Sequence, residues 1–472
     1  MHFAIDHLHE RFRHARAALV ALFVAAGHPS PAVQAQAPAP QSAHMRITAT
    51  TPHMAADDPQ LAPPPEAPRK IGSWHEALRL VRQQAPRYQR ELENVARARA
   101  QSRLAVAAVL PNLNGSANYT RQFITERIVL AEKPVDTPVP NVVGVSAVAS
   151  WQIGNLRSYY SIGTASLNVD VSERAFAEQR RELANSVLDA LLGTLVTARV
   201  AEANRVGLRA ALEREQLART RLHFGQGTTL DIDRAASDVV TARGEIVRGD
   251  EALRRAREAL GLALGSSTPI AAADEIDIDR FEQAVVDTCK LNRAVEERPD
   301  VAAARLRVRA TERASTEIYL QFAPSLSIAS HVSYNSMVTY GPKTTWDLTA
   351  MLNVPFFDVT RYAQLEDARV ATRQAQADLN TVRLQALVEV SQAQRASDVA
   401  QKSLAIAEDA RAVAERIDQS TRAMYADGLG TSLELVNSAQ DLRRTRLSAI
   451  QARFELARAR SAQILALAEC QY

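Results

Sequence analysis

Few residues in this chain have the spacing of catalytic groups. Segment 9–14 holds two histidines and a glutamate without the spacing of a zinc-protease helix, and His75-Glu76 has no second histidine at the required distance. The acidic pair Asp231 and Asp233 has no histidine or cysteine to converge with. We therefore expect no enzymatic activity, no catalytic residue, no cofactor and no metal site.

The most informative motif occurs twice. Residues 225–231 read Gly-Gln-Gly-Thr-Thr-Leu-Asp, and residues 428–434 read Gly-Leu-Gly-Thr-Ser-Leu-Glu. A glycine suits the left-handed residue that ends a helix, and a threonine followed three residues later by an acidic residue is typical of a helix start. The pattern predicts two tight helix–helix turns, at 225–228 and 428–431, in which Asp231 and Glu434 serve first as caps.

The two cysteines, Cys289 and Cys470, are far apart in the sequence. In an oxidising compartment such an isolated pair is a disulfide candidate. The alternative is two unpaired buried thiols, because spacing alone does not show that two residues are close.

The first residues have the features of an export signal. Three arginines precede a short apolar run at 17–27, and Val33-Gln34-Ala35 offers a small-x-small cleavage site. The run is too short to span a bilayer, so 1–35 is interpreted as a signal peptide, with an uncleaved anchor as the alternative. No cysteine follows it, and we expect no lipid anchor. Residues 36–70, rich in proline and alanine, are expected to be a linker.

Composition favours long helices over a conventional globular core. Apolar residues make up 46% of the chain but aromatic residues only 5%, which suits helices packed through small side chains. The net charge of +3 comes from well-mixed acidic and basic residues, which argues against a nucleic-acid partner.

Long proline-free segments precede both glycine turns. They are predicted to form helices over 173–222 and 358–425, and each chain reversal is followed by another helix, at 229–264 and 432–468. Helices of this length must pack against one another as a coiled coil. A further helix begins at a Ser73 cap and is expected to run to Leu110.

Alternating polar and apolar residues predict four strands, at 113–125, 160–170, 325–335 and 344–356. Each is longer than a typical globular strand and matches a tilted membrane-spanning strand. The alternative is a soluble two-hairpin sheet with one buried face, for which the sequence offers no partner layer.

The order of these elements repeats, giving halves at 71–264 and 291–470 joined by an irregular linker at 265–290. Four strands cannot close a membrane barrel, and open edges are not tolerated in lipid. Rotational symmetry would complete the barrel, and three copies give twelve strands. The fold class is therefore mainly α with a membrane β-barrel part.

The chain resembles the TolC-like outer-membrane efflux family over residues 71–470. The resemblance rests on the order of several short motifs in the duplicated frame: Ser73-Trp74-His75-Glu76-Ala77-Leu78 with Pro86, Leu110-Pro111-Asn112-Leu113, Arg298-Pro299-Asp300-Val301, Ala323-Pro324-Ser325-Leu326, Val354-Pro355-Phe356-Phe357-Asp358, and both glycine turns. It implies a homotrimer with a 12-stranded barrel in outer-membrane lipid and an α-helical tunnel across the periplasm. It also implies a periplasmic adaptor at the tunnel tips and an inner-membrane transporter.

The resemblance assigns roles to the turns. Asp231 and Glu434 would ring the tunnel entrance, and Tyr425, three residues before the turn glycine, would help to lock it. The basic residue that sometimes accompanies this tyrosine in the family, two positions after the glycine, is replaced by Gly430. The adaptor-binding tips would include Gly225, Gly227, Gly428, Leu429 and Gly430.

Two export systems fit such a duct. The expected absence of a lipid anchor favours type I secretion of a polypeptide such as a toxin, with an ATP-binding-cassette (ABC) transporter in the inner membrane. The alternative is a multidrug or heavy-metal efflux pump of the resistance-nodulation-division (RND) type. A purely structural coiled-coil protein is the rival class, and the four long alternating strands argue against it.

Overall fold

The computed structural model describes residues 58–472, apart from 122, 124–126, 131–132, 137–140, 275, 279–280 and 337–341. The chain divides into units 1–53 and 54–472, and the description concerns the second. The predicted signal peptide at 1–35, most of the linker predicted at 36–70, and parts of the strand predicted at 113–125 lie outside the described residues.

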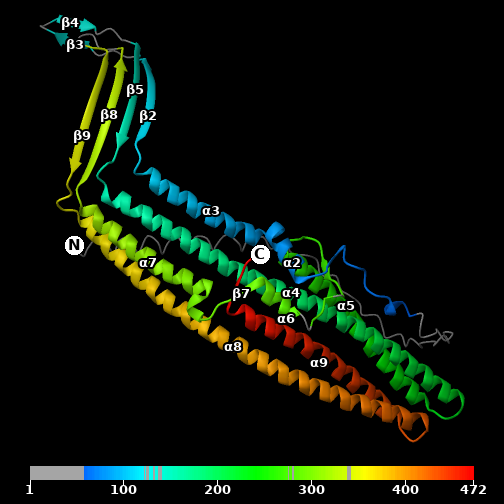
Figure 1. Cartoon of the computed structure of the whole chain (residues 1–472). Helices are drawn as coiled ribbons and strands as arrows, with labels where there is room; N and C mark the ends of the chain where they lie inside the picture. The colour runs from blue at the N-terminus through cyan, green and yellow to red at the C-terminus, as the bar shows by residue number, and fades with distance from the viewer. Residues whose placement is uncertain are drawn as a thin grey trace, which may run out of the picture. The chain divides into compact units, whose positions relative to one another are not determined.

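Two long helical hairpins dominate this unit (Figure 1). In the first, α4 (Leu156–His223) turns into α5 (Thr229–Ala263), and in the second, α8 (Val359–Ala426) turns into α9 (Ser432–Leu465). At about 1.5 Å per residue, α4 and α8 each extend roughly 100 Å. The helices predicted before and after both turns are present, and α4 begins earlier than expected.

Alanine at heptad spacing lets α8 pack closely. Its buried positions include alanines seven residues apart, among them Ala400, Ala407 and Ala414. Repetition every seven residues keeps one face of a helix against its neighbours along its length. The neighbours are α7 (Pro299–Tyr319) and α9, and α3 (Pro86–Ala107) packs beside α4.

The helix predicted from Ser73 to Leu110 is two helices. The Ser73 hydroxyl caps α2 (Trp74–Gln84), accepting from the amide of Glu76 at 3.2 Å. Ala85 is extended, with φ −70° and ψ 118°, and α3 starts at Pro86. A proline fits the first turn of a helix but disfavours helical backbone in the residue before it, so the chain bends there.

Among the described residues, a four-stranded antiparallel sheet forms in the order β2 (Asn112–Arg121), β5 (Asn141–Trp151), β8 (Ser325–Asn335) and β9 (Thr344–Asn353). The strands predicted at 325–335 and 344–356 are confirmed, the second ending a little earlier. Figure 1 shows this sheet at the ends of α3, α4, α7 and α8 that lie away from the hairpin turns.

The strand predicted at 160–170 is wrong, because these residues lie inside α4. The side chain of Asn155 accepts from the amide of Ser158 at 3.3 Å and starts the helix ahead of the alternating segment. The actual strand, β5, escaped detection because Val142 and Val148 put apolar side chains on its otherwise polar face and Gly144 interrupts the pattern. A period-two pattern over seven residues is too short to outweigh a continuous helix.

The sheet has one polar and one apolar face. The register places Asn114, Ser116, Ser146, Ser333, Thr345 and related residues on one side. The other side carries large exposed apolar side chains, including Leu113, Tyr119, Val145, Val332, Trp346 and Leu348. No described layer of the chain covers this face, which argues against the soluble-sheet alternative.

Residues 265–290, expected to be irregular, contribute to the core. They contain β6 (Ile270–Ala272) and α6 (Phe281–Thr288), followed by β7 (Cys289–Leu291). The prediction failed because Phe281 and Val285 are apolar and fully buried, and the Phe281 ring packs edge-on against Trp74 at 5.5 Å. The strand β6 pairs in parallel with β1 (Arg69–Ile71), at the end of the predicted linker.

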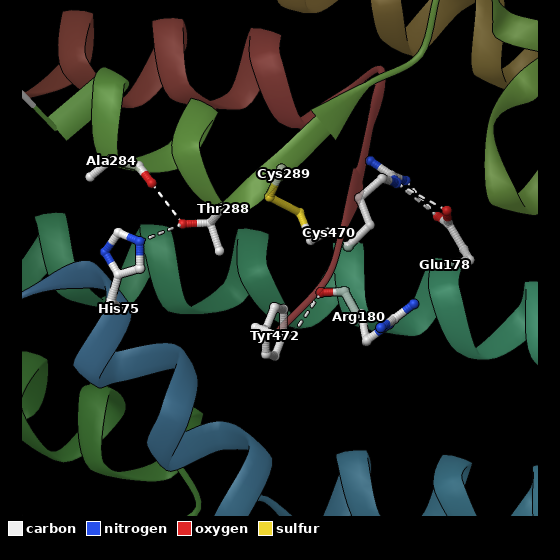
Figure 2. The surroundings of a disulfide bond; sticks show 9 residues. His75, Glu178, Arg180, Ala284, Thr288, Cys289, Cys470 and Tyr472 are labelled. Carbon is white, nitrogen blue, oxygen red and sulfur yellow. Dashed lines mark hydrogen bonds and ion pairs between the residues drawn. A yellow bond between two sulfur atoms is a disulfide. The ribbon is translucent and has the colours of Figure 1, made fainter.

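A disulfide joins the two cysteines, which is one of the two alternatives that the sequence left open. Cys289 in β7 faces Cys470 in β10 (Ala468–Cys470), and their sulfur atoms are bonded (Figure 2). Beside it, the Tyr472 hydroxyl donates to the carbonyl oxygen of Arg180 at 2.9 Å. We call this disulfide and the buried residues around it, most of them from α2, α3, α4, α5, α6 and α9, the central core.

Shorter elements complete the described chain: the 3₁₀ helices η1 (Pro59–Leu61), η2 (Val295–Glu297) and η3 (Leu320–Phe322), and the paired strands β3 (Arg127–Leu130) and β4 (Lys133–Asp136). Among the described helices, α4 holds a stretch long and apolar enough to cross a membrane by length and composition alone. The leucines of 183–195 in α4 are buried in the central core, which accounts for much of the apolar character of this helix.

Candidate functional site

The two hairpin turns share one backbone design. In the first, the amide of Gly225 donates to the carbonyl of Leu222 at 3.0 Å, and the amide of Gln226 donates to that of Arg221 at 2.9 Å. Gly225 has φ +70° and Gly428, which ends α8 in the same way, has φ +79°. Glycine adopts this left-handed conformation without the steric cost that other residues meet.

The second glycine of each turn lies against the preceding helix. A Cβ on Gly227 would be 3.2 Å from the amide nitrogen of Leu222, and one on Gly430 would be 3.1 Å from that of Tyr425. These contacts are tighter than a side chain normally tolerates. The Gly-x-Gly spacing therefore has a steric origin in both copies.

Both following helices begin with a capping box. The Thr228 hydroxyl accepts from the amide of Asp231 at 3.3 Å, and the Asp231 carboxylate accepts from the amide of Thr228 at 2.9 Å. Thr431 and Glu434 make the same reciprocal pair at 3.2 and 2.9 Å. The capping role expected for these carboxylates is therefore present in both turns.

Asp231 also joins the two hairpins, whereas the hydrogen bonds of Glu434 to described residues stay within its own turn. The Ser432 hydroxyl of the second hairpin donates to the Asp231 carboxylate, and Arg234 donates to Ser432 at 3.2 Å. The hydrogen bond from Ser432 lowers the pKa of Asp231, and the hydrogen bond from the Thr431 amide lowers that of Glu434. Both carboxyls are thus stabilised as anions.

Tyr425 has a basic partner that the sequence analysis did not identify. The Arg221 guanidinium, from the first hairpin, lies 4.3 Å from the centre of the Tyr425 ring and donates a hydrogen bond to the Tyr425 carbonyl oxygen. Tyr425 is buried, and burial raises the pKa of its hydroxyl. The family resemblance places this partner at position 430 of the same hairpin, where this chain has a glycine. The spacing of residues along one hairpin does not indicate which residue of the other hairpin lies beside it.

The turns also present apolar side chains to solvent. Leu429 is 78% exposed, and Phe224 at the end of α4 is 71% exposed. Gly225 and Gly428 leave open space around their α-carbons, since a Cβ on Gly225 would meet no atom within 4 Å and one on Gly428 only the flexible end of Arg221. Exposed apolar groups at a helix tip are typical of a protein-binding surface.

Beyond the turns, a buried ion cluster joins α4, α5 and α9. The Asp238 carboxylate is almost fully buried and pairs with Arg214 at 2.6 Å and with Arg443 at 3.0 Å. The amide nitrogen of Gln440 lies 3.3 Å from it. This cluster is not recognisable in the sequence, because its members come from three helices and no local motif links them.

Metal-ligating side chains do not gather in the part of the chain that the structure describes. No cluster of three histidine, cysteine or acidic side chains in the described part of the chain is arranged to hold a metal ion. What the turns provide is a polar, anionic and partly apolar end to a pair of long helical hairpins.

Comparison with protein families gives one match that covers most of the chain. The model of the outer membrane efflux protein family matches residues 77–266 and 291–468. Each matched segment contains one of the two hairpins and one of the two glycine turns.

Individual relatives are distant. The cation efflux system protein CusC of Escherichia coli (strain K12) is 22% identical over 227 residues, which are 47% of this chain and 50% of that protein. The aligned part thus spans about half the length of this curated relative.

Solved structures are similar over much more of the chain. A crystal structure of CusC superposes with a TM-score of 0.73 at 19% identity, covering 86% of this chain and 99% of that one. The outer membrane protein VceC from Vibrio cholerae gives 0.69 at 18% identity, covering 84% and 95%. At such identities the likeness shows a shared fold.

Proposed function

Because the chain belongs to the outer membrane efflux protein family, we propose that it forms the exit duct of a tripartite export system. The family places it in the outer membrane as an efflux channel with a barrel part and a helical tunnel. The proposal adds that three copies assemble, that a periplasmic adaptor binds the hairpin turns, and that an inner-membrane transporter drives the export.

The observation that carries the proposal is the incomplete sheet. Its strands β2 and β9 each have one edge without a partner among the described strands, and the exposed apolar face of the sheet suits lipid. Unpaired backbone groups are too costly in a bilayer, so the edges need strands from other copies. The helices α4 and α8 follow shortly after strands β5 and β9 of this sheet. In a trimer, these helices would therefore extend the barrel into a helical tube.

The inner-membrane partner is proposed to be an efflux pump of the RND type. The name of the curated relative, a cation efflux system protein, favours efflux over polypeptide secretion. Type I secretion with an ABC transporter, which the sequence analysis put first, stays a prediction that the experiment below tests.

The experiment places a photo-crosslinker at Leu429 in cells and identifies trapped proteins by mass spectrometry. The control carries the crosslinker at Leu104 of α3, which is similarly exposed at 68% but lies outside the turns. An adaptor trapped only from Leu429 is expected, and its co-purifying transporter distinguishes an RND pump from an ABC transporter. Equal trapping at both positions, or no periplasmic partner, would contradict the proposal.

A further inference from the structure

The two hairpins align without a gap. Helix α4 covers residues 156–223 and α8 covers 359–426, so both have 68 residues and corresponding positions are 203 residues apart. The same offset relates Thr229, the first residue of α5, to Ser432, the first residue of α9. Any contact between α4 and α9 therefore has an equivalent pair of positions on α8 and α5.

Within the chain, α4 packs against α9, and we call this contact the α4–α9 seam. The Arg443 side chain of α9 crosses α4 at Gly207, where a Cβ would lie 3.0 Å from Arg443 Cδ. Beyond this crossing, the guanidiniums of Arg443 and Arg214 both pair with the buried carboxylate of Asp238, at 3.0 and 2.6 Å. Charged side chains around a single carboxylate thus close the seam.

The positions equivalent to Gly207 and Arg443 differ from them in a matching way. Ala410 of α8 is the equivalent of Gly207, and Val240 of α5 is the equivalent of Arg443. An arginine that crosses a helix closely needs a glycine beneath it, whereas a valine is short enough to leave room for the methyl group of an alanine. Both pairs of residues therefore fit one geometry of close contact between two helices.

The surface equivalent to the α4–α9 seam is apolar and exposed. On α8, larger apolar side chains replace Ala203, Ala210 and Arg214 of α4, and they are Ile406, Val413 and Ile417. In the single chain, Ile406 is 70% exposed and Val240 is 67% exposed. The positions of α4 to which these α8 residues correspond are partly buried against other helices. Burial of the apolar surface against a partner would stabilise it in the same way.

Both exposed surfaces have the spacing of a helix–helix contact. On α8, Val399, Ile406 and Val413 are seven residues apart, and on α5 so are Val240 and Val247. Apolar residues repeated every seven positions face the same neighbouring helix along a coiled coil. The buried alanines of α8 face helices of the same chain, so the exposed stripe is a second face of this helix. The partner that fits it is another long helix with a matching repeat, and α5 of a second copy has that repeat.

We propose that α8 of one copy packs against α5 of the next copy, with Ala410 beside Val240, in the manner of the α4–α9 seam. This contact rests on the proposed function, in which three copies assemble, and it names the surfaces through which they meet. Because the two surfaces differ, each copy offers α8 to one neighbour and α5 to the other, and the contact repeats until a ring closes. The tube then alternates a charged seam within each copy and an apolar seam between copies.

The test uses two full-length chains with tags of different size, co-expressed in cells. One chain carries Ala410→Cys and the other carries Val240→Cys, and isolated outer membranes are treated with bismaleimidoethane, which joins two nearby thiols. The native cysteines are bonded to each other and offer no free thiol. A crosslinked dimer that holds both tags is expected, because the two thiols lie side by side only if α8 of one copy contacts α5 of the other.

The matched control replaces Val240→Cys by Arg254→Cys. Position 254 is also exposed and lies two heptads, or about 21 Å, further along the same side of α5. Crosslinking to Ala410→Cys should therefore fall by at least about tenfold, since a short linker does not span that distance.

Native mass spectrometry of the same membranes, extracted in mild detergent, separates this contact from the proposed function. Four results would overturn the contact and leave the duct proposal standing: trimers without the mixed crosslink, equal crosslinking at positions 240 and 254, Ala410→Cys crosslinked to itself, or a different protein attached in place of the second copy. Absence of trimers would overturn both.

Discussion

The central core and the hairpin turns are held together in different ways. Around Cys289 and Cys470, a disulfide and large buried side chains from six helices fix the chain. At the turns, the two hairpins meet through a few polar contacts, chiefly Arg221 with Tyr425 and Ser432 with Asp231. Contacts of this kind contribute about 1 kcal/mol each and form and break without disturbing a core.

This difference suits a tube that is rigid in its middle and adjustable at its end. Regions that open locally have few buried apolar contacts, and the turns meet that description. The sequence duplication does not extend to the contacts between hairpins. Arg221 aligns with Met424 and Leu222 with Tyr425, so the copies have diverged at the positions where they touch.

The largest effect is expected from removing the disulfide. Cys470→Ser opens a loop of 181 residues and should lower the free energy of unfolding by about 3–5 kcal/mol. The reason is that the disulfide reduces the conformational entropy of the unfolded chain, and the substitution restores it. Proteolytic susceptibility and hydrogen exchange in β7 and β10 should rise, while exchange at the turns changes little. Reductant should reproduce the effect in the unsubstituted protein and add nothing to Cys470→Ser.

A smaller, local effect is expected from Arg221→Ala. The substitution removes the stacking on Tyr425 and the hydrogen bond to its carbonyl, worth about 1–3 kcal/mol together. Faster hydrogen exchange should be confined to the turns. If the turns also form the tunnel entrance, as the family resemblance implies, channel conductance in planar bilayers should rise. The control is Met424→Ala, at the aligned position of the other copy. Equal changes in hydrogen exchange and conductance for both variants would contradict a specific role of Arg221 in joining the hairpins.

The carboxylates should respond unequally. Asp231→Asn weakens both a cap and the contact to Ser432, at a cost of about 1 kcal/mol after allowance for solvent screening, while Glu434→Gln weakens a cap alone and costs less. If both carboxylates also ring the entrance, reversing both charges should shift the reversal potential away from cation selectivity. Unchanged selectivity would leave capping as their only role.

The smallest effect is a dependence of the turns on pH. The folded pKa values of Asp231 and Glu434 are lowered, so their contribution is complete above the unfolded values near 4 and is lost as the pH falls through the lowered values. Hydrogen exchange, corrected for its intrinsic pH dependence, should speed up at the turns below about pH 4 and stay constant in the central core. Protection at the turns that persists in acid would contradict the capping account.

The sequence alone determined the features that local chemistry dictates. Long proline-free segments required helices, the glycines at 225 and 428 required reversals, and Thr228 and Thr431 with their acidic partners required caps. Each depends on residues within about one helical turn of one another, so the pattern is visible along the chain. The alternation of polar and apolar residues predicted three of the four strands of the sheet. It failed at β5, because Gly144, Val142 and Val148 interrupt the polar positions of that strand.

Only the tertiary structure decided which distant residues meet. The pairing of Cys289 with Cys470, the reach of Arg221 to Tyr425 on the other hairpin, and the burial of Asp238 between two arginines each join segments far apart in the chain. Such contacts depend on how the helices pack and in what register, which the spacing of residues along one helix does not encode.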